Sequence, residues 1–366
     1  MKKLLSVVGA RPNFIKIAPV DKALRKHSKV VSHKICHTGQ HFDDCMSKVF
    51  FDELKMPRPD FYLGVGGGSH ASQTARIMLE LEKVYELERP DMVIVPGDVN
   101  STMAAALVAS KMGIPIAHVE AGLRSFDKTM PEEINRIITD VVSDLLFVTE
   151  HSGTKNLRDE GVDSDKIFFV GNTMIDTLED HYELIEESSV AADMGLTQGQ
   201  YILATFHRPT NVDDKQGLSD LIDTLKRLAG DRKLIFPVHP RTMKNIKEFG
   251  LDSDLPAGLV LTPPKGYIEF LSLMRYAELV VTDSGGIQEE TTYMGVQCIT
   301  VRKNTERPVT IDVGTNHLVG TDLEKVEKTA LDILGGTTKP GRIPEMWDGK
   351  AAKRIAAIIV DKLSNL

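Results

Sequence analysis

The fold is decided within residues 92–120, which read MVIVPGDVNSTMAAALVASKMGIPIAHVE. Residues 92–95 and 114–119 are short apolar runs rich in β-branched side chains, a composition that favours strands. The segment between them, residues 101–112, is rich in alanine and other helix formers. A strand, a helix and a strand in this order predict a βαβ unit whose two strands lie parallel in one sheet.

The same alternation continues on both sides of this unit. Strand-like runs lie at residues 4–8, 30–36, 145–148 and 167–170, and a second series follows at 201–205, 233–238, 259–261, 279–282, 298–301 and 317–319. We therefore predict an α/β protein with two Rossmann-like doubly wound domains, residues 1–172 and 173–351. Ile355, Ile359 and Leu363 have helical spacing and predict a last helix over residues 352–366.

Length and composition agree with two globular domains. At about 150 residues per domain, 366 residues correspond to about two domains. A hydrophobic content of 42% with 26% charged residues is typical of ordinary soluble proteins and argues against disorder. Lys and Arg total 44 against 52 Asp and Glu, and a net charge of -8 argues against nucleic acid or an anionic membrane as a partner.

Two further features predict a cytoplasmic protein. Cys36, Cys45 and Cys298 form no C-x-x-C pair, and three cysteines suit a reducing compartment better than a disulfide framework. The apolar run at residues 4–8 is shorter than the ~7 to 15 residues of a signal-peptide core, and no apolar run approaches the ~18 residues of a membrane span.

Ligands of open parallel sheets bind outside the carboxyl ends of the strands, so the residues after each apolar run are the candidates for function. Gly9-Ala10-Arg11-Pro12 follows the first run, with Lys16 nearby. A glycine turn that opens a helix offers backbone N–H groups to a phosphate, and Arg11 adds a fixed cation. The alternative is an ordinary turn with a surface arginine.

Three acids are candidates for proton transfer. Asp98 and Glu120 follow the two strands of the βαβ unit, which places both at one edge of the sheet, and acids in one cleft can serve as acid and base. Asp98 could instead cap the following helix. Glu132 lies in Pro131-Glu132-Glu133, where acids could simply stabilise the first turn of a helix.

The second half offers titratable and anion-binding groups. His207-Arg208 and His239-Pro240-Arg241 follow two strand-like runs and suggest an anion site with a base. A third strand-like run is followed by Asp283-Ser284-Gly285-Gly286-Ile287-Gln288-Glu289-Glu290. Here Ser284, Gly285 and Gly286 would let a diphosphate approach a helix N-terminus. Glu290 could accept hydrogen bonds from a ribose. Arg302, Glu306 and Arg307 could complete this anion site.

Several cofactor and nucleophile motifs are missing from the sequence. No G-x-G-x-x-G follows the first strand, and neither G-x-x-x-x-G-K-[ST] nor G-x-S-x-G occurs. His37 and His41 have the i, i+4 spacing of a zinc pair, but Thr38-Gly39 between them favours a loop. We therefore predict neither a nicotinamide cofactor nor a metal.

Taken together, these motifs resemble the non-hydrolysing UDP-N-acetylglucosamine 2-epimerases, in the family's order and over nearly the whole chain. The resemblance rests on Gly9-Ala10-Arg11-Pro12, Thr38-Gly39-Gln40-His41, Gly97-Asp98, residues 118–124, Pro131-Glu132-Glu133 with Asn135-Arg136, His207-Arg208, residues 283–290 and Thr305-Glu306-Arg307-Pro308. It implies a glycosyltransferase-B-like fold with the UDP-sugar in a cleft between the domains, a last helix that returns to the N-terminal domain, and a homodimer. The reaction would supply precursors of cell-surface polysaccharides.

The resemblance also implies roles for individual residues. Asp98, Glu120 and Glu132 match the family's catalytic carboxylates and His207 its active-site histidine. Arg11, Ser284, Gly285, Gly286 and Arg307 match the residues that hold the diphosphate, Glu290 the one on the ribose, and Lys265 and Phe270 positions near the uracil. Gln40, His41, Arg208 and His239 lie in motifs with which some bacterial members bind a second substrate molecule, although Asp43 stands where those members tend to have Gln.

The chemistry expected of these groups is elimination and re-addition of UDP. Carbon 2 of the sugar is not next to a carbonyl, so loss of its proton becomes feasible when UDP leaves carbon 1 and a glycal forms. Three alternatives remain at this point: carbon 2 epimerisation of a UDP-diacetamido-uronic acid, a UDP-sugar glycosyltransferase, and a UDP-sugar sensor without catalysis.

Overall fold

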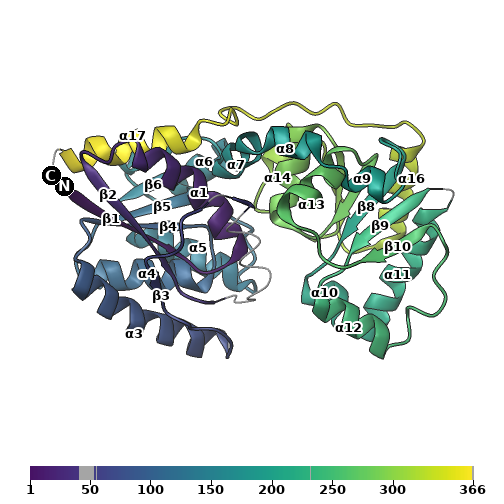
Figure 1. The fold of residues 1–366 in the computed structure, drawn as a ribbon, viewed down its shortest axis with the longest axis horizontal. Coiled ribbons are helices and arrows are strands. Elements are labelled where there is room, and N and C mark those ends of the chain that lie inside the picture. Colours follow the sequence, from purple (N-terminus) through teal and green to yellow (C-terminus); the bar gives the residue numbers. More distant parts are fainter. Residues whose placement is uncertain (41–52, 55, 231, 365–366) are drawn as a thin grey trace. The chain divides into compact units, whose positions relative to one another are not determined.

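The computed structural model describes residues 1–40, 53–54, 56–230 and 232–364. It contains two compact units, the first made of Met1–Asp180 with Glu345–Leu366 and the second of His181–Pro344 (Figure 1). His41, Asp43 and Cys45 lie outside the described residues.

The first unit is a doubly wound parallel sheet. Its seven strands lie in the order β3-β2-β1-β4-β5-β6-β7, and every neighbouring pair is parallel. The strands are β1 Lys2–Val8, β2 Val31–His37, β3 Phe61–Tyr62, β4 Met92–Pro96, β5 Ile116–Ala121, β6 Leu145–Val148 and β7 Ile167–Phe169. The helices are α1 Arg11–Arg25, α3 His70–Glu88, α4 Asn100–Lys111, α5 Pro131–Val142, α6 His151–Asp159, α7 Thr173–Asp180 and α17 Ala351–Ser364, with a 3-10 turn at Ser164–Lys166.

The second unit repeats this topology. Its six strands lie in the order β10-β9-β8-β11-β12-β13, again all parallel. They are β8 Tyr201–Thr205, β9 Lys233–Pro237, β10 Leu259–Thr262, β11 Leu279–Thr282, β12 Gln297–Thr300 and β13 Asn316–Leu318. The helices are α8 Tyr182–Glu187, α9 Val190–Asp193, α10 Pro209–Val212, α11 Lys215–Ala229, α12 Pro240–Glu248, α13 Tyr267–Arg275, α14 Gly285–Met294, α15 Val309–Asp312 and α16 Leu323–Leu334.

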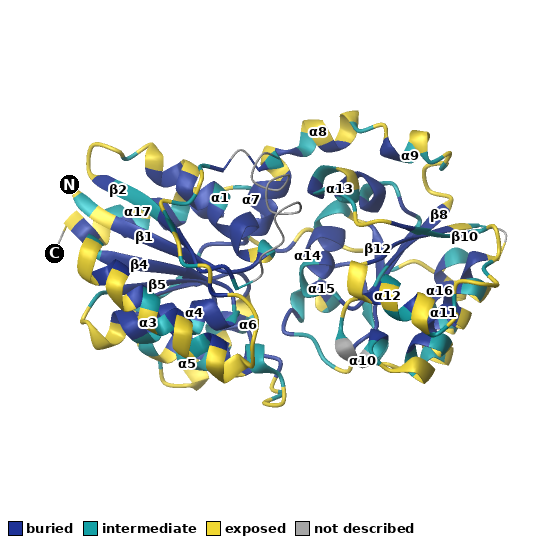
Figure 2. Cartoon of the chain, turned by 60° about the horizontal axis from the view of Figure 1, so that its bottom comes forward, coloured by how far each residue is buried: buried dark blue, intermediate teal, exposed yellow. Residues whose placement is uncertain are grey.

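The inner strands of both sheets, among them β4 and β11, are buried along their whole length, which explains why they are continuous apolar runs. In the first unit α1, α7 and α17 pack together, and α3, α4 and α5 form a second group of packed helices. Buried strands and half-exposed helices are visible throughout both units in Figure 2.

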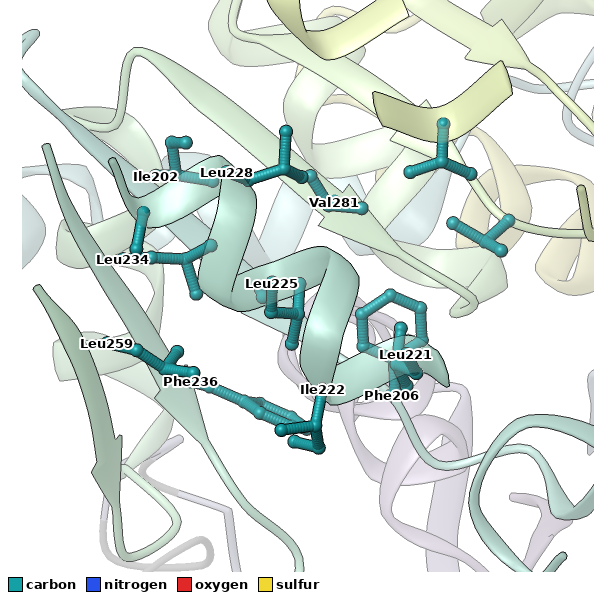
Figure 3. Packing of buried hydrophobic residues seen from close by; sticks show 14 of the residues in the cluster. Ile202, Phe206, Leu221, Ile222, Leu225, Leu228, Leu234, Phe236, Leu259 and Val281 are labelled. Carbon is teal, nitrogen blue, oxygen red and sulfur yellow. The ribbon is translucent and has the colours of Figure 1, made fainter. Parts of the chain in front are cut away.

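The core of the second unit shows how one helix is fixed on its sheet. Leu221, Ile222, Leu225 and Leu228 recur at helical spacing on one side of α11 and pack among strand residues such as Phe236 (Figure 3). Each such side chain contributes roughly 1.5–3 kcal/mol when it is fully buried. The opposite side of α11 is polar, so the apolar face alone decides how this helix lies.

The first unit is completed by a segment from the far end of the sequence. Asp176 of α7 accepts hydrogen bonds from the backbone N–H groups of Ala351 (3.0 Å) and Ala352 (2.7 Å), the first residues of α17. Trp347, just before this helix, is buried and donates from Nε1 to the Thr149 carbonyl at 2.9 Å. The division after Asp180 comes later than the boundary expected at 172 and 173, because α7 packs on α1 through a 2.6 Å bond from Thr177 Oγ1 to the Ile15 carbonyl.

The predicted fold class is confirmed: both units have parallel sheets with helices between the strands. The predicted strands match the observed ones closely, while β3 was not predicted because a strand of two residues is too short to form a recognisable run. Within the described ranges, no helix combines the length and the apolar character that crossing a membrane requires.

Candidate functional site

Each sheet changes direction once, and the loops at that point carry most of the predicted site residues. The strand order reverses between β1 and β4 in the first unit and between β8 and β11 in the second. In doubly wound sheets the carboxyl ends of such strands form the ligand-binding crevice, because the two loops lead away from it in opposite directions. Each unit therefore has one candidate half-site.

In the first unit the loops after β1 and β4 are tied together. The Asn13 side chain accepts hydrogen bonds from the backbone N–H of Gly9 (3.0 Å) and donates to the Pro96 carbonyl (3.0 Å). A Cβ atom on Gly9 would come within 2.1 Å of Ser101 Oγ, so only glycine fits between the two loops. Arg11 begins α1 directly after this turn and is half-buried.

Asp98 is positioned by α5 and does not cap α4. The N-cap of α4 is Val99, and Asp98 Oδ2 accepts a hydrogen bond from Arg136 Nη1 at 2.5 Å, while Asn135 holds the Asp98 carbonyl at 2.9 Å. The capping alternative is therefore wrong: the N-cap of α4 is another residue with no side-chain cap bond, and the Asp98 carboxylate is held by an arginine of α5.

Glu120 lies on the neighbouring strand end in a rare backbone conformation. Its φ of 76° is positive, and the pairing of β5 with β6 shifts register around it. A non-glycine residue with positive φ stores strain, and such strain is often found at functional sites. The side chain is buried and pairs with the buried Lys16 ammonium at 2.7 Å.

Lys16 connects the two acid loops. A Cβ atom on Gly97 would lie 2.9 Å from Lys16 Nζ, and Gly97 N donates to the Val119 carbonyl at 2.9 Å. The structure thus brings the loops of Asp98 and Glu120 together, as their strand positions predicted, and places a cation between them.

Glu132 and Glu133 begin α5 but have different surroundings. Glu133 is buried and accepts hydrogen bonds from the backbone of Ser125 and Phe126, both at 2.9 Å, and from Arg136 at 2.7 Å. Burial acts to raise the pKa of Glu133, but these bonds outweigh it and lower the pKa. Glu132 is half-buried and makes no hydrogen bond or ion pair with the described part of the chain.

In the second unit a buried carboxylate orients His207. The imidazole Nδ1 lies 2.8 Å from Asp283 Oδ1, and Asp283 also accepts bonds from Arg208 N and from the Asn211 amide, each at 2.9 Å. Burial acts to raise the pKa of Asp283, but these donors outweigh it and hold the pKa below its usual value. An ionised Asp283 fixes the proton of His207 on Nδ1, so Nε2 of this half-exposed ring remains for a ligand.

The glycine-rich helix start follows β11 directly. Ser284 is the N-cap of α14, and Gly285 and Gly286 form its first turn. A Cβ atom on Gly285 would come within 2.7 Å of Arg307 Nη1. Arg307 is itself buried and pairs with Glu306 and, at 2.9 Å, with Glu289, so a guanidinium group lies beside the N-terminus of this helix. Glu290 is buried further along α14.

The remaining candidates of the second unit lie at other strand ends. His239 follows β9 as the N-cap of α12, where its Nδ1 accepts a bond from Arg241 N at 3.3 Å. Lys265 precedes α13 and Phe270 lies within it, both partly buried. Their assignment to a nucleotide remains a prediction.

No group of histidine, cysteine or acidic side chains in the described ranges has the arrangement of a metal site. Of the histidine pair considered for zinc, only His37 is described. Its Nδ1 accepts a bond from Gly39 N at 2.7 Å, and burial lowers its pKa to about 4.

A model of the UDP-N-acetylglucosamine 2-epimerase family matches residues 22–360 of the chain. The chain belongs to this family. The UDP-N-acetylglucosamine 2-epimerase of Methanocaldococcus jannaschii is 43% identical over 364 residues, which cover 98% of both chains. A Pseudomonas aeruginosa UDP-2,3-diacetamido-2,3-dideoxy-D-glucuronate 2-epimerase is 41% identical and covers 97% of this chain and 98% of its own.

Solved structures of the family agree with the fold. The M. jannaschii enzyme in complex with UDP-GlcNAc and UDP has a TM-score of 0.90 at 43% identity, over 98% of this chain and 99% of that one. The Neisseria meningitidis epimerase bound to UDP-GlcNAc has a TM-score of 0.86 at 30% identity and is covered completely, as is this chain. The resemblance to the UDP-N-acetylglucosamine 2-epimerases is thereby confirmed.

The sequence alone did not reveal two residues that hold candidate site residues in place. Arg136 holds Asp98, and Asp283 holds His207. Both were quoted within motifs, but neither received a role, because their partners are 38 and 76 residues away in the sequence. The sequence indicates only that Arg136 lies in a helix and that Asp283 directly follows a strand.

Proposed function

We propose that the chain interconverts UDP-N-acetylglucosamine and UDP-N-acetylmannosamine by eliminating UDP and adding it back. The C2–H and C1–O bonds break, a C1–C2 double bond forms, and the electron pair of the C1–O bond leaves with UDP. Addition in reverse returns a proton to the other face of carbon 2. A carboxylate accepts the first proton, and a carboxylic acid supplies the second.

The observation that carries the proposal is the pair of acids at the switch point of the first sheet. Asp98 follows β4 and Glu120 lies near the end of the neighbouring β5, and each is ion-paired with a buried cation, Arg136 and Lys16 respectively. The cations hold both carboxylates in place, while Glu132 makes no hydrogen bond or ion pair with the described residues. We assign the proton transfers to these three acids.

The second unit supplies the groups for the leaving diphosphate. The N-terminus of α14 with Gly285 and Gly286 presents backbone N–H groups, and Arg307 lies beside it. His207 Nε2 can donate a proton or a hydrogen bond to a departing phosphate oxygen, because Asp283 holds the ring by its other nitrogen. We assign Ser284 and Arg11 to the same diphosphate, Glu290 to the ribose, and Lys265 and Phe270 to the uracil.

Charge pairing favours a neutral sugar over a uronic acid. Three cations in the described part of the first unit lie beside the acid loops, Lys16, Arg136 and Arg124, and each already binds a carboxylate of the chain at 2.5–2.7 Å. A sugar carboxylate entering this half-site would meet Asp98 and Glu120 without an uncommitted cation among these three. UDP-2,3-diacetamido-2,3-dideoxy-glucuronate, the substrate class named for the P. aeruginosa relative, is therefore the second candidate.

We also propose that the protein is a homodimer and is located in the cytoplasm. Large apolar side chains are exposed on α3 and α5, among them Leu79, Leu87 and Val141, which supports a contact with a second copy. Cys36 and Cys298 are free and buried, which suits a reducing compartment. Sedimentation equilibrium at micromolar concentration tests the dimer.

Epimerisation in deuterium oxide tests the mechanism. The purified protein is incubated with each of the two UDP-sugars, and the products are followed by proton NMR. We expect an epimer of UDP-N-acetylglucosamine with deuterium at carbon 2, and slow release of UDP and free glycal. Asp98→Asn and Glu120→Gln should each lower turnover by roughly 10²-fold with little change in UDP affinity.

Each alternative gives a different result in this experiment. An epimer that keeps its carbon 2 hydrogen contradicts elimination. Faster turnover of the uronic acid assigns the chain to the second candidate. If neither sugar is converted, two functions remain. A glycosyltransferase would transfer the sugar to an added acceptor, and a sensor would bind the UDP-sugar without changing it.

A further inference from the structure

A buried histidine–aspartate pair lies directly behind the two acid loops of the first unit. His118 in β5 and Asp140 in α5 are both buried, and His118 Nδ1 lies 2.6 Å from Asp140 Oδ1. The other ring nitrogen, Nε2, lies 2.8 Å from the Gly97 carbonyl. Because a carbonyl only accepts hydrogen bonds, Nε2 must be the donor in this contact.

Asp140 is ionised and therefore also accepts from the ring. Burial acts to raise its pKa, but His118 and Arg124 outweigh burial, and the net shift is downward. Arg124 Nη1 lies 2.7 Å from Asp140 Oδ2 and is itself paired with Glu160. The backbone N–H of Gly122 donates to the same oxygen at 3.1 Å.

The two outward bonds of this pair end on the loops of the proposed acids. Gly97, which accepts from His118, immediately precedes Asp98, and Gly122, which donates to Asp140, follows Glu120 by two positions. Gly97 and Gly122 have φ values of 65° and 78°. Glycine tolerates this conformation but does not enforce it, so the turns need external bonds to hold them.

We propose that His118 and Asp140 are positioning residues, which fix the backbone of the Asp98 and Glu120 loops relative to each other. The inference rests on the proposed function, because it assumes that these acids move the carbon 2 proton. Because both side chains are buried, we assign neither of them a direct contact with the substrate. The hydrogen bonds of His118 and Asp140 to Gly97 and Gly122 fix the positions of the two acids when the glycal is bound.

Misplaced acids should change how the glycal is partitioned. Once UDP has left, the glycal is either protonated and recombined with UDP or released from the enzyme. Slower protonation leaves more time for release, so the ratio of free glycal to epimerised product rises. Partial unfolding reduces the amount of active enzyme but does not change this ratio, which separates positioning from a merely structural role.

Two substitutions of His118 differ in whether they keep its hydrogen bond to the Gly97 carbonyl. The amide of glutamine reaches the place of Nε2, so His118→Gln can keep a donor to the Gly97 carbonyl, whereas His118→Asn loses it. A matched control is His33→Asn. His33 is a buried histidine of the same sheet that pairs with Asp21 at 2.7 Å and with Ser6 at 2.7 Å, with no bond to the acid loops.

The experiment measures kcat, KM and the glycal-to-epimer ratio with UDP-N-acetylglucosamine for the full chain and each variant. For His118→Asn we expect kcat to fall on the order of 10²-fold, KM to change little and the ratio to rise. His118→Gln should lie closer to the wild type, and His33→Asn should keep the wild-type ratio. If His118→Asn does not fold, Asp140→Asn is measured in its place.

Two results would overturn the inference alone: an unchanged ratio in the variant that folds, His118→Asn or, in its place, Asp140→Asn, or an equal rise in His33→Asn. A wild-type protein that forms no epimer from any UDP-sugar would overturn the proposed function and this inference with it. The two failures are thus distinguished by the wild-type reaction.

Discussion

At the scale of single residues, neighbours in the sequence can have opposite roles. Glu132 and Glu133 look alike in the motif, and both lie in the first turn of α5, as their position after Pro131 predicted. Only the structure separates them, because Glu133 points to the backbone of the preceding loop while Glu132 has no partner in the described part of the chain.

The first prediction uses this pair. Glu132→Gln should lower kcat by roughly 10²-fold and leave thermal stability unchanged, because it removes a carboxylate that supports nothing else. Glu133→Gln should destabilise the fold by about 1–3 kcal/mol, because a buried arginine and two backbone donors lose their charged acceptor. Thermal unfolding and steady-state kinetics of both variants check this. Equal losses of stability would contradict the assignment of Glu132 to catalysis.

The second prediction concerns pH. Burial lowers the pKa of His37 to about 4 in the folded chain, below the usual value of about 6.5. As the pH falls below 6.5, His37 becomes protonated in the unfolded chain but stays neutral in the folded chain. The free energy of unfolding therefore decreases between pH 6.5 and 4. From pH 7 to pH 5 this single group should cost about 2 kcal/mol.

His37→Asn removes this titration while an amide oxygen can still accept from Gly39 N. Denaturant unfolding at pH 7 and pH 5 should therefore show a smaller loss for the variant than for the wild type. Parallel losses in the two proteins would mean that other groups carry the acid sensitivity.

At the scale of elements, most strands could be predicted because those in the middle of each sheet, such as β4 and β11, are buried apolar runs bounded by turn residues. The location of the loops that follow the strands could also be predicted, since the carboxyl ends of parallel strands lie at one edge of the sheet. The contacts made there were not. The bond between Asp98 and Arg136 of α5 and the bond between His118 and Asp140 join distant parts of the sequence, and nothing in local composition marks such partners.

The third prediction tests the start of α14. Gly285→Ala places a methyl group within 2.7 Å of Arg307 Nη1 and 2.8 Å of Glu306 Oε1, so the guanidinium must move away from the helix N-terminus. The loss of one charge-assisted bond should weaken UDP binding about tenfold.

Calorimetric titration with UDP checks this, with Gly258→Ala as the control. Gly258 is also crowded, at 3.0 Å from the Arg232 carbonyl, but it precedes β10 at the opposite end of the strands. A Gly285→Ala variant with wild-type UDP affinity would remove Arg307 from the diphosphate site.

At the scale of the whole molecule, the first unit depends on a helix that follows the second unit in the sequence. The α17 segment is held by an N-terminal cap from another helix, Asp176, and by buried apolar residues such as Ile355 and Ile359. An N-terminal cap of this kind is worth about 0.5–2 kcal/mol.

The fourth prediction uses Trp347, the only tryptophan of the chain, as its reporter. Asp176→Ala removes two bonds from the start of α17, so Trp347 emission should shift to longer wavelength at a lower denaturant concentration than in the wild type. Asp180→Ala is the matched control, because its ion pair with Lys22 lies on the surface and such pairs contribute little. Equal midpoints for the two variants would contradict the role of Asp176.

The split of the first unit also sets an order of events during synthesis. The ribosome makes α17 only after the entire second unit, so the second unit can close around its own core while α1 and α7 still lack the helix that covers them. The part of the chain that is translated first is therefore the part that finishes folding last. Nascent chains arrested after residue 344 should consequently resist protease across the second unit and remain sensitive in the first.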